Sequence, residues 1–322
     1  MAVRSESRKR GLGLLLVFGA VMAFALFARI GQLTLPLAGL LVATRARRGH
    51  VIAASFLVGV SLWWLAQVGN PPDQLVRAAA VVGSTVFVAA FVSMKWSHTH
   101  RSLVAMGLAA GGVTVMFAAL RISWPEVRWW VESRIQFAAQ MTLTRMSGNR
   151  FGTGGDLTSN DPMVGQLEGW FEAGIPLLAD YFPALVAVQM FAGFALAMVL
   201  FRRIAPELGV TLARFRDFRF SEHLGWIAVV SLAIVLMVRA AALKLLAANV
   251  LVVAGMLYAL RGSAVVVFGL ALTGGPGLIT TGIIALSVVF MLPVVLTGTI
   301  LLGVVDTGLD LRRRWSTPQE RT

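Results

Sequence analysis

The 322-residue sequence contains no cysteine and only four histidines. Without cysteine there can be no disulfide, no thiolate metal ligand and no thiol nucleophile. His98 and His100 lie close together, but the short loop that holds them has no nearby carboxylate to complete a ligand set. We therefore expect no metal site and no bound cofactor.

Recognisable catalytic arrangements are also missing. The serines within apolar runs, such as Ser61 and Ser84, have no histidine or lysine at a spacing typical of an activated nucleophile. We expect that the protein is not an enzyme, and the sequence offers no catalytic residue.

Charge is scarce, at 13% of residues, whereas 57% are hydrophobic. This is too little charge to cover a soluble globule, and apolar runs of about 20 residues match the hydrocarbon thickness of a bilayer. The net charge of +13 comes from short basic clusters beside apolar runs. That distribution is typical of cytoplasmic loops and argues against a nucleic-acid partner. The sequence predicts an all-α, polytopic integral membrane helix bundle that contacts the lipid bilayer.

We predict about 8–10 transmembrane helices. The first follows a basic N-terminus that resembles a signal peptide, but its apolar run is longer than the usual signal core of about 7–15 residues, so we read it as a retained span. The lower count holds if part of 240–273 is buried or re-entrant. Within the spans, Gly107 and Gly111 are expected to support close helix packing. The predicted spans are 11–29, 33–45, 51–68, 76–94, 103–120, 181–201, 225–240, 246–260, 262–273 and 279–302.

Basic residues orient the bundle. Clusters after the second, fourth, sixth and last predicted spans place both termini and the 202–224 loop in the cytoplasm. Arg239 and Lys244 are exceptions, since they fall on the outer side between two spans.

The chain divides into three parts: N-terminal membrane helices over 1–120, an extracytoplasmic segment over 121–180, and C-terminal membrane helices over 181–322. In the middle part Val127, Val131 and Ile135 recur at helical spacing, next to three tryptophans. This pattern predicts an amphipathic helix in the outer interface, where tryptophan is enriched. The segment is either a surface cap or a lid for a partner.

A group of polar residues interrupts the apolar C-terminal third. On a continuous helix Tyr258, Arg261 and Gly262 would share a face, while Asn249 would point roughly the opposite way. We therefore predict that Arg261-Gly262 marks a turn between two short helices, with Arg261 at the cytoplasmic headgroups. Asn249 would hydrogen-bond a neighbouring span. The alternative is a ligand site built from these residues together with Arg239 and Lys244.

A second group lies at the C-terminal end. Asp306, Asp310 and Arg314 are spaced i, i+4 and i+8, so Asp310 is expected to pair with Arg314 on a helix leaving the last span. Glu222 and Trp226 are predicted on the same cytoplasmic side. The group is either an interfacial clamp or a docking surface for a protein partner.

Three C-terminal stretches, FRDFRFSEHLGWIAVV, AANVLVVAGMLYALRGSAVVVFGLAL and LLGVVDTGLDLRRRW, resemble the YybS-like family of predicted bacterial membrane proteins, domain of unknown function 2232. The close match covers about residues 215–315, and the family's usual glutamine appears here as Arg261. The family has no agreed activity, and it is thought to be distantly related to the S components of energy-coupling-factor transporters and to the rod-shape protein MreD.

The resemblance implies a multi-pass protein of the bacterial inner membrane. It suggests a non-enzymatic scaffold or assembly subunit of an envelope complex. The alternative is a transport component that binds a small hydrophobic or vitamin-like ligand. Likeness of fold does not choose between them.

Overall fold

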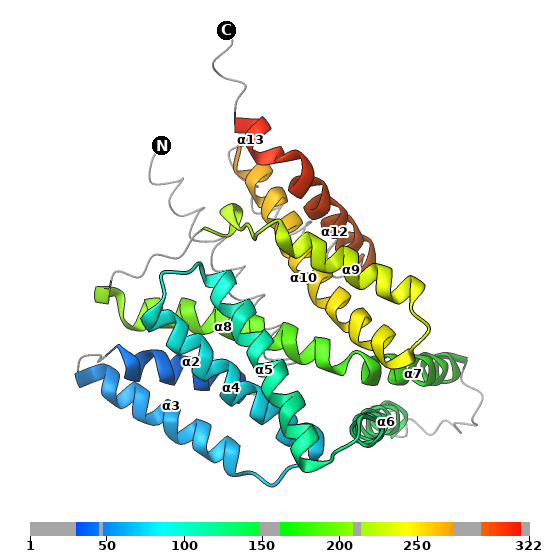
Figure 1. Cartoon of the computed structure of the whole chain (residues 1–322). Helices are drawn as coiled ribbons and strands as arrows, with labels where there is room; N and C mark the ends of the chain where they lie inside the picture. The colour runs from blue at the N-terminus through cyan, green and yellow to red at the C-terminus, as the bar shows by residue number, and fades with distance from the viewer. Residues whose placement is uncertain (1–29, 45–47, 149–161, 209–213, 273–290, 317–322) are drawn as a thin grey trace.

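The computed structural model describes residues 30–44, 48–148, 162–208, 214–272 and 291–316. The predicted first span, 11–29, lies outside these ranges. The described residues form a helical bundle (Figure 1). Its helices are α2 (Ile30–Ala43), α3 (Arg48–Ala66), α4 (Pro71–Ser93), α5 (His98–Leu120), α6 (Trp124–Gly148), α7 (Pro162–Asp180), α8 (Phe182–Ile204), α9 (His223–Met237), α10 (Ala241–Leu272), α12 (Leu292–Leu309) and α13 (Leu311–Ser316), with short 3-10 turns η2 (Pro206–Leu208) and η3 (Phe215–Asp217).

Four of the described helices, α4, α5, α8 and α10, are long and apolar enough to cross a membrane. Shorter apolar helices cover Gly31–Ala43, Val51–Ala66, His223–Met237 and Pro293–Leu309. Helix α4 begins at Pro71, before the predicted start at 76, because its first turn is polar and therefore falls outside the apolar run. The two prolines at its start suit the first turn, whose N–H groups need no partner within the helix.

The N-terminal half packs around a core shared by α2, α3, α4, α5 and α8. Helix α4 buries Val76, Gly83 and Phe87, which recur at helical spacing on one face. The ring of Phe87 stacks on Phe194 of α8, with 4.6 Å between the ring centroids. The expected close packing at Gly107 and Gly111 is wrong for the part of the chain that the structure describes, where no atom lies within 4 Å of a Cβ placed at either glycine.

The C-terminal half consists of α9, α10, α12 and α13, and it corrects a second prediction. Arg261 and Gly262 do not form a turn: they lie inside α10, which is one continuous helix of 32 residues. Gly255 faces Ile300 in the middle of α12, and Gly269, further along α10, faces Trp315 on α13. Helices α10 and α12 therefore run in the same direction (Figure 1).

The close approach in this bundle occurs between α10 and α12. A Cβ atom placed on Gly262 would lie 1.9 Å from the carbonyl oxygen of Thr299, and one placed on Gly303 would lie 2.1 Å from that of Tyr258. Only glycine allows two helix backbones to come this near, as small residues do in membrane bundles. Gly262 thus allows α10 to pack closely against α12 and does not mark a break in the helix.

Residues 121–180 supply α6 and α7, which are seen nearly end-on in Figure 1 and so run transverse to the main bundle helices. Val127 and Val131 of α6 are buried against Ala179 of α7. Two ion pairs join α6 to its neighbours: Arg134 to Asp73 of α4 at 2.7 Å, and Arg128 to Asp180 of α7 at 3.2 Å. The extracytoplasmic position of this segment stays a prediction.

Candidate functional site: a buried arginine–aspartate cluster

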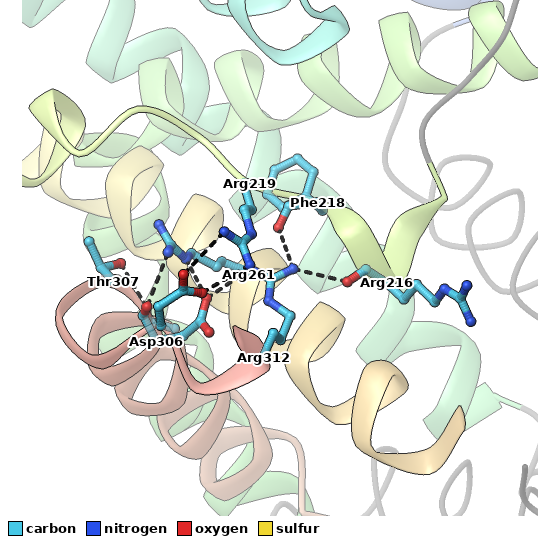
Figure 2. Close-up of polar contacts among 9 residues, drawn as sticks. Arg216, Phe218, Arg219, Arg261, Asp306, Thr307 and Arg312 are labelled. Atoms are coloured by element: carbon cyan, nitrogen blue, oxygen red, sulfur yellow. Dashed lines mark hydrogen bonds and ion pairs between the residues drawn. The ribbon is translucent and has the colours of Figure 1, made fainter. Parts of the chain in front are cut away.

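The site is centred on Asp306, which is 0% exposed on the last full turn of α12. Its Oδ2 atom accepts hydrogen bonds from Arg261 Nε and Arg312 Nη2, each at 2.8 Å (Figure 2). Arg261 Nη2 also donates to the backbone oxygen of Asp306 at 3.1 Å. We call Arg261, Asp306 and Arg312 the arginine–aspartate cluster.

Arg312 reaches Asp306 because the helix is interrupted between them. Helix α12 ends at Leu309, and Asp310 adopts a left-handed conformation with φ of 44°. Aspartate is one of the few side chains that tolerate this region. The turn starts α13 and brings Arg312 back over Asp306, where the side chain is only 3% exposed.

Arg312 also holds a segment that is distant in the sequence. Its Nη1 atom donates to the backbone oxygens of Arg216, at 2.9 Å, and Phe218, at 3.1 Å (Figure 2). These carbonyls belong to the 214–222 segment, which contains η3 and leads into α9. Through one buried carboxylate, α10, α12, α13 and the 214–222 segment are therefore joined.

The cluster holds two cations and one anion, so the remaining positive charge needs other partners. Backbone oxygens accept from both arginines, and the guanidinium of Arg261 lies 5.3 Å from the centroid of the Phe220 ring. Carbonyl dipoles and an aromatic face both stabilise a cation that has been removed from water. Phe220 in turn packs edge-on against Tyr258.

These contacts correct three predictions. Arg261 is buried and does not reach cytoplasmic headgroups. Asp306 is buried, so it cannot form part of an exposed docking surface. Asp310 pairs with Arg219 at 2.9 Å, whereas the predicted pair was with Arg314; Asp310 is a left-handed residue between α12 and α13, so the predicted continuous helix from Asp306 to Arg314 does not form.

The other predicted site residues lie apart from the cluster. Glu222, Trp226 and Arg314 are exposed, with Trp226 on the first turns of α9. Arg239 and Lys244 are exposed at the turn between α9 and α10. That turn is at the opposite end of the helical hairpin from the cluster (Figure 1).

Asn249 is buried on α10 and hydrogen-bonds the neighbouring helices, as the sequence indicated. Its Oδ1 accepts from the backbone N–H of Ala184, and its Nδ2 donates to the backbone oxygens of Asp180 and Leu245, all at 2.9 Å. The N–H of Ala184 lies in the first turn of α8, where helical N–H groups have no partner within their own helix. Asn249 thus joins the start of α8 to α10.

Tyr258 lies on the other side of α10, next to a small apolar hollow. The hollow has a volume of about 70 Å³ and is lined by α5, α9 and α10 side chains such as Leu103, Leu224 and Leu257. This volume is far below the roughly 300–1,000 Å³ typical of pockets for small-molecule ligands. Asn249, Tyr258, Arg239 and Lys244 are therefore not brought together around one ligand site.

Replacing Asn249 with alanine is expected to lower the free energy of unfolding by about 1–3 kcal/mol, because two backbone groups lose their partner in a dry environment. Tyr258→Phe is the matched control on the same helix. Its hydroxyl makes no hydrogen bond within the described part of the chain, so the change should be small. Denaturant titration of both variants in micelles tests this, and equal stabilities would contradict the structural role of Asn249.

The sequence patterns did not predict that Arg312 is buried or that it pairs with Asp306. It stands six positions after Asp306, a spacing that does not place two residues on one helical face. The only available signal was an aspartate in an apolar span, which demands a cation nearby. Within the described ranges, no three histidine, aspartate or glutamate side chains are grouped so as to hold a metal ion.

The fold and its apolar helices define the chain as an all-α, multi-pass membrane helix bundle, as predicted. A family model described as "Predicted membrane protein (DUF2232)" matches residues 13–307, and the chain belongs to this family. The match begins far before residue 215, so the family resemblance extends over both halves of the bundle. Neither a curated protein nor a solved structure matches the chain.

Proposed function

We propose that the chain is a non-enzymatic scaffold or assembly subunit of a bacterial envelope complex, and that its predicted cytoplasmic end docks a protein partner. The observation that carries this proposal is the arginine–aspartate cluster. Buried ion pairs contribute little net stability, but they can fix one arrangement of the elements that they join. Here the buried ion pairs join the 214–222 segment at the surface to the ends of α10 and α12.

The surface held by the cluster is charged on its outside. Arg214, Arg219 and Glu222 are exposed along the 214–222 segment, and Asp310 pairs with Arg219 at its edge. Such exposed pairs contribute at most about 1 kcal/mol to the stability of the fold. Their arrangement is therefore better explained by binding of a protein partner than by stabilisation of the bundle. Positive and negative side chains on a rigid backbone can select one partner with complementary charges and fix its orientation.

The alternative is a solute-binding transport component in the inner membrane. Its candidate residues, Asn249, Tyr258, Arg239 and Lys244, support it less well. Asn249 has hydrogen-bond partners on both sides of its amide, and the hollow beside Tyr258 is too small for a vitamin-like solute. The charged 214–222 segment, held in place by the arginine–aspartate cluster, supports the scaffold proposal better.

The docking proposal predicts that the double change Arg214→Glu and Arg219→Glu abolishes co-purification of the partner while the protein remains folded. Both side chains are exposed, so the change in unfolding free energy should stay within about 1 kcal/mol. Affinity purification in mild detergent after cross-linking in cells, followed by identification of bound proteins, is the measurement.

Arg203→Glu is the control, since it reverses an exposed charge at the end of α8, outside the 214–222 segment. This variant should retain the partner. Retention of the partner by the double variant, or equal loss in both, would reject docking at the 214–222 segment.

A further inference from the structure

The apolar hollow beside Tyr258 lies between α5 and α9, with α10 at its base. Its lining includes Leu103 of α5, Ile227 of α9 and Val253 of α10. Its volume of about 70 Å³ is several times the roughly 10–15 Å³ that holds one water molecule, so it has room for a side chain. Ile227 is 50% exposed, and the hollow therefore opens to the outer surface of the bundle.

Tyr258 brings an unpaired polar group to this apolar hollow. The residue is only 8% exposed, and its hydroxyl group makes no hydrogen bond within the described part of the chain. Gly225 of α9 leaves space for the hydroxyl, because a Cβ atom placed on this glycine would lie 3.0 Å from the oxygen. Tyrosine hydroxyls that are removed from water usually have a hydrogen-bond partner. Tyr258 therefore offers a hydrogen bond to a group that does not belong to the described residues.

The side of the hollow that α5 forms continues as a face of small residues. Leu103 is followed on the same face of the helix by three exposed residues, Gly107, Ala110 and Thr114. The exposed side of α9, in contrast, carries large apolar side chains such as Leu236, which suit contact with lipid tails. Small residues allow helix backbones to approach closely and are enriched where membrane helices pack against each other.

These features match a membrane-spanning helix better than a lipid tail. A lipid tail cannot form a hydrogen bond with the hydroxyl of Tyr258, whereas a polar side chain on a helix can. The hollow also adjoins the 214–222 segment, because Phe220 of that segment is one of its lining residues. A helix packed over the hollow would therefore extend the proposed docking surface along the side of the bundle.

We propose that the partner docked by the 214–222 segment is an integral membrane protein. One of its membrane-spanning helices packs along the small-residue face of α5, places a side chain in the hollow and forms a hydrogen bond with Tyr258. This inference rests on the proposed docking function and adds the class of partner, a membrane protein in place of a soluble cytoplasmic protein. It also gives a role to Gly107, which packs against no described residue.

The first test is photo-cross-linking in cells, with a photoreactive phenylalanine analogue introduced in place of Ala110 and the cross-linked peptide sequenced. We expect this peptide to come from an apolar segment of about 20 residues in another protein, which is the length of a membrane span. The same analogue in place of Leu108 is the control. Leu108 is also exposed, but it points to the opposite side of α5 and should not form this cross-link.

Co-purification of the protein identified in this way is the second test. Ala110→Phe adds a ring to an exposed position, so it should abolish co-purification without changing the melting temperature, whereas Leu108→Phe should retain the partner. Tyr258→Phe removes only the hydroxyl. It should weaken partner binding by about threefold to tenfold, as expected for one hydrogen bond between membrane helices.

The variants separate this inference from the docking proposal. Loss of the partner in the Arg214→Glu and Arg219→Glu double variant, with full retention in Ala110→Phe and Tyr258→Phe, would reject the helix site and leave docking at the 214–222 segment intact. Retention of the partner in the double variant would reject docking itself. Cross-links from position 110 only to lipid, to a second copy of this chain or to a soluble protein would also overturn the proposal.

Discussion

Asp306→Asn is expected to lower the free energy of unfolding by about 3–5 kcal/mol, because two buried arginines lose the carboxylate with which both pair. The substitution keeps the size and shape of the side chain, so the loss reports on charge and not on packing. Unfolding in mixed micelles with increasing denaturing detergent provides the measurement.

Asp310→Asn is the matched control. Its ion pair with Arg219 is exposed, and asparagine tolerates the left-handed backbone that this position requires. Its effect should be below about 1 kcal/mol. In the Asp306→Asn background, Arg261→Gln should recover part of the lost stability by removing one orphaned cation. Equal effects of the two asparagine variants would contradict the buried role of Asp306.

Gly262→Ala is expected to destabilise the bundle by about 3 kcal/mol or more, at the upper end of overpacking effects. The added carbon would meet the backbone oxygen of Thr299 at 1.9 Å, and backbone cannot rotate away as a side chain can. Helices α10 and α12 would have to separate, which would also pull Arg261 from Asp306. Gly303→Ala should behave in the same way, since its added carbon meets Tyr258.

Gly298→Ala and Gly308→Ala, on the same helix α12, are the controls. A Cβ at either position has no neighbour within 4 Å among the described residues, so these variants should be as stable as the wild-type protein or slightly more stable. Thermal unfolding in detergent distinguishes the two pairs. Similar melting temperatures for Gly262→Ala and Gly298→Ala would show that the helices are not in backbone contact.

Composition and apolar run length were sufficient to predict the membrane bundle, because a bilayer requires helices of that length. The nine-residue spacing of Asn249 and Tyr258 was also sufficient to predict that their side chains point to opposite sides of one helix, since this follows from helix geometry alone. The turn at Arg261-Gly262 was wrong because an arginine and a glycine in an apolar run resemble a span boundary. What keeps them inside one helix is tertiary: an aspartate 45 positions later and a glycine opposite.

The cluster itself could not be predicted from local patterns. Asp306 and Arg312 meet only because the helix ends between them, and the end depends on a single left-handed residue. The helical spacing of Asp306, Asp310 and Arg314 was therefore applied to residues that do not share a helix. The buried Asp306 supplies the negative charge that a buried cation at position 261 needs.

Amide hydrogen exchange measures directly whether the buried arginine–aspartate cluster holds the 214–222 segment in place. In that segment the N–H groups of Asp217 and Phe218 donate to backbone oxygens, so they should be protected in the wild-type protein. In Asp306→Asn their exchange should accelerate by at least about tenfold, while peptides from α4 and α8 remain unchanged. Identical exchange of the 214–222 segment in both proteins would show that the cluster does not hold this segment.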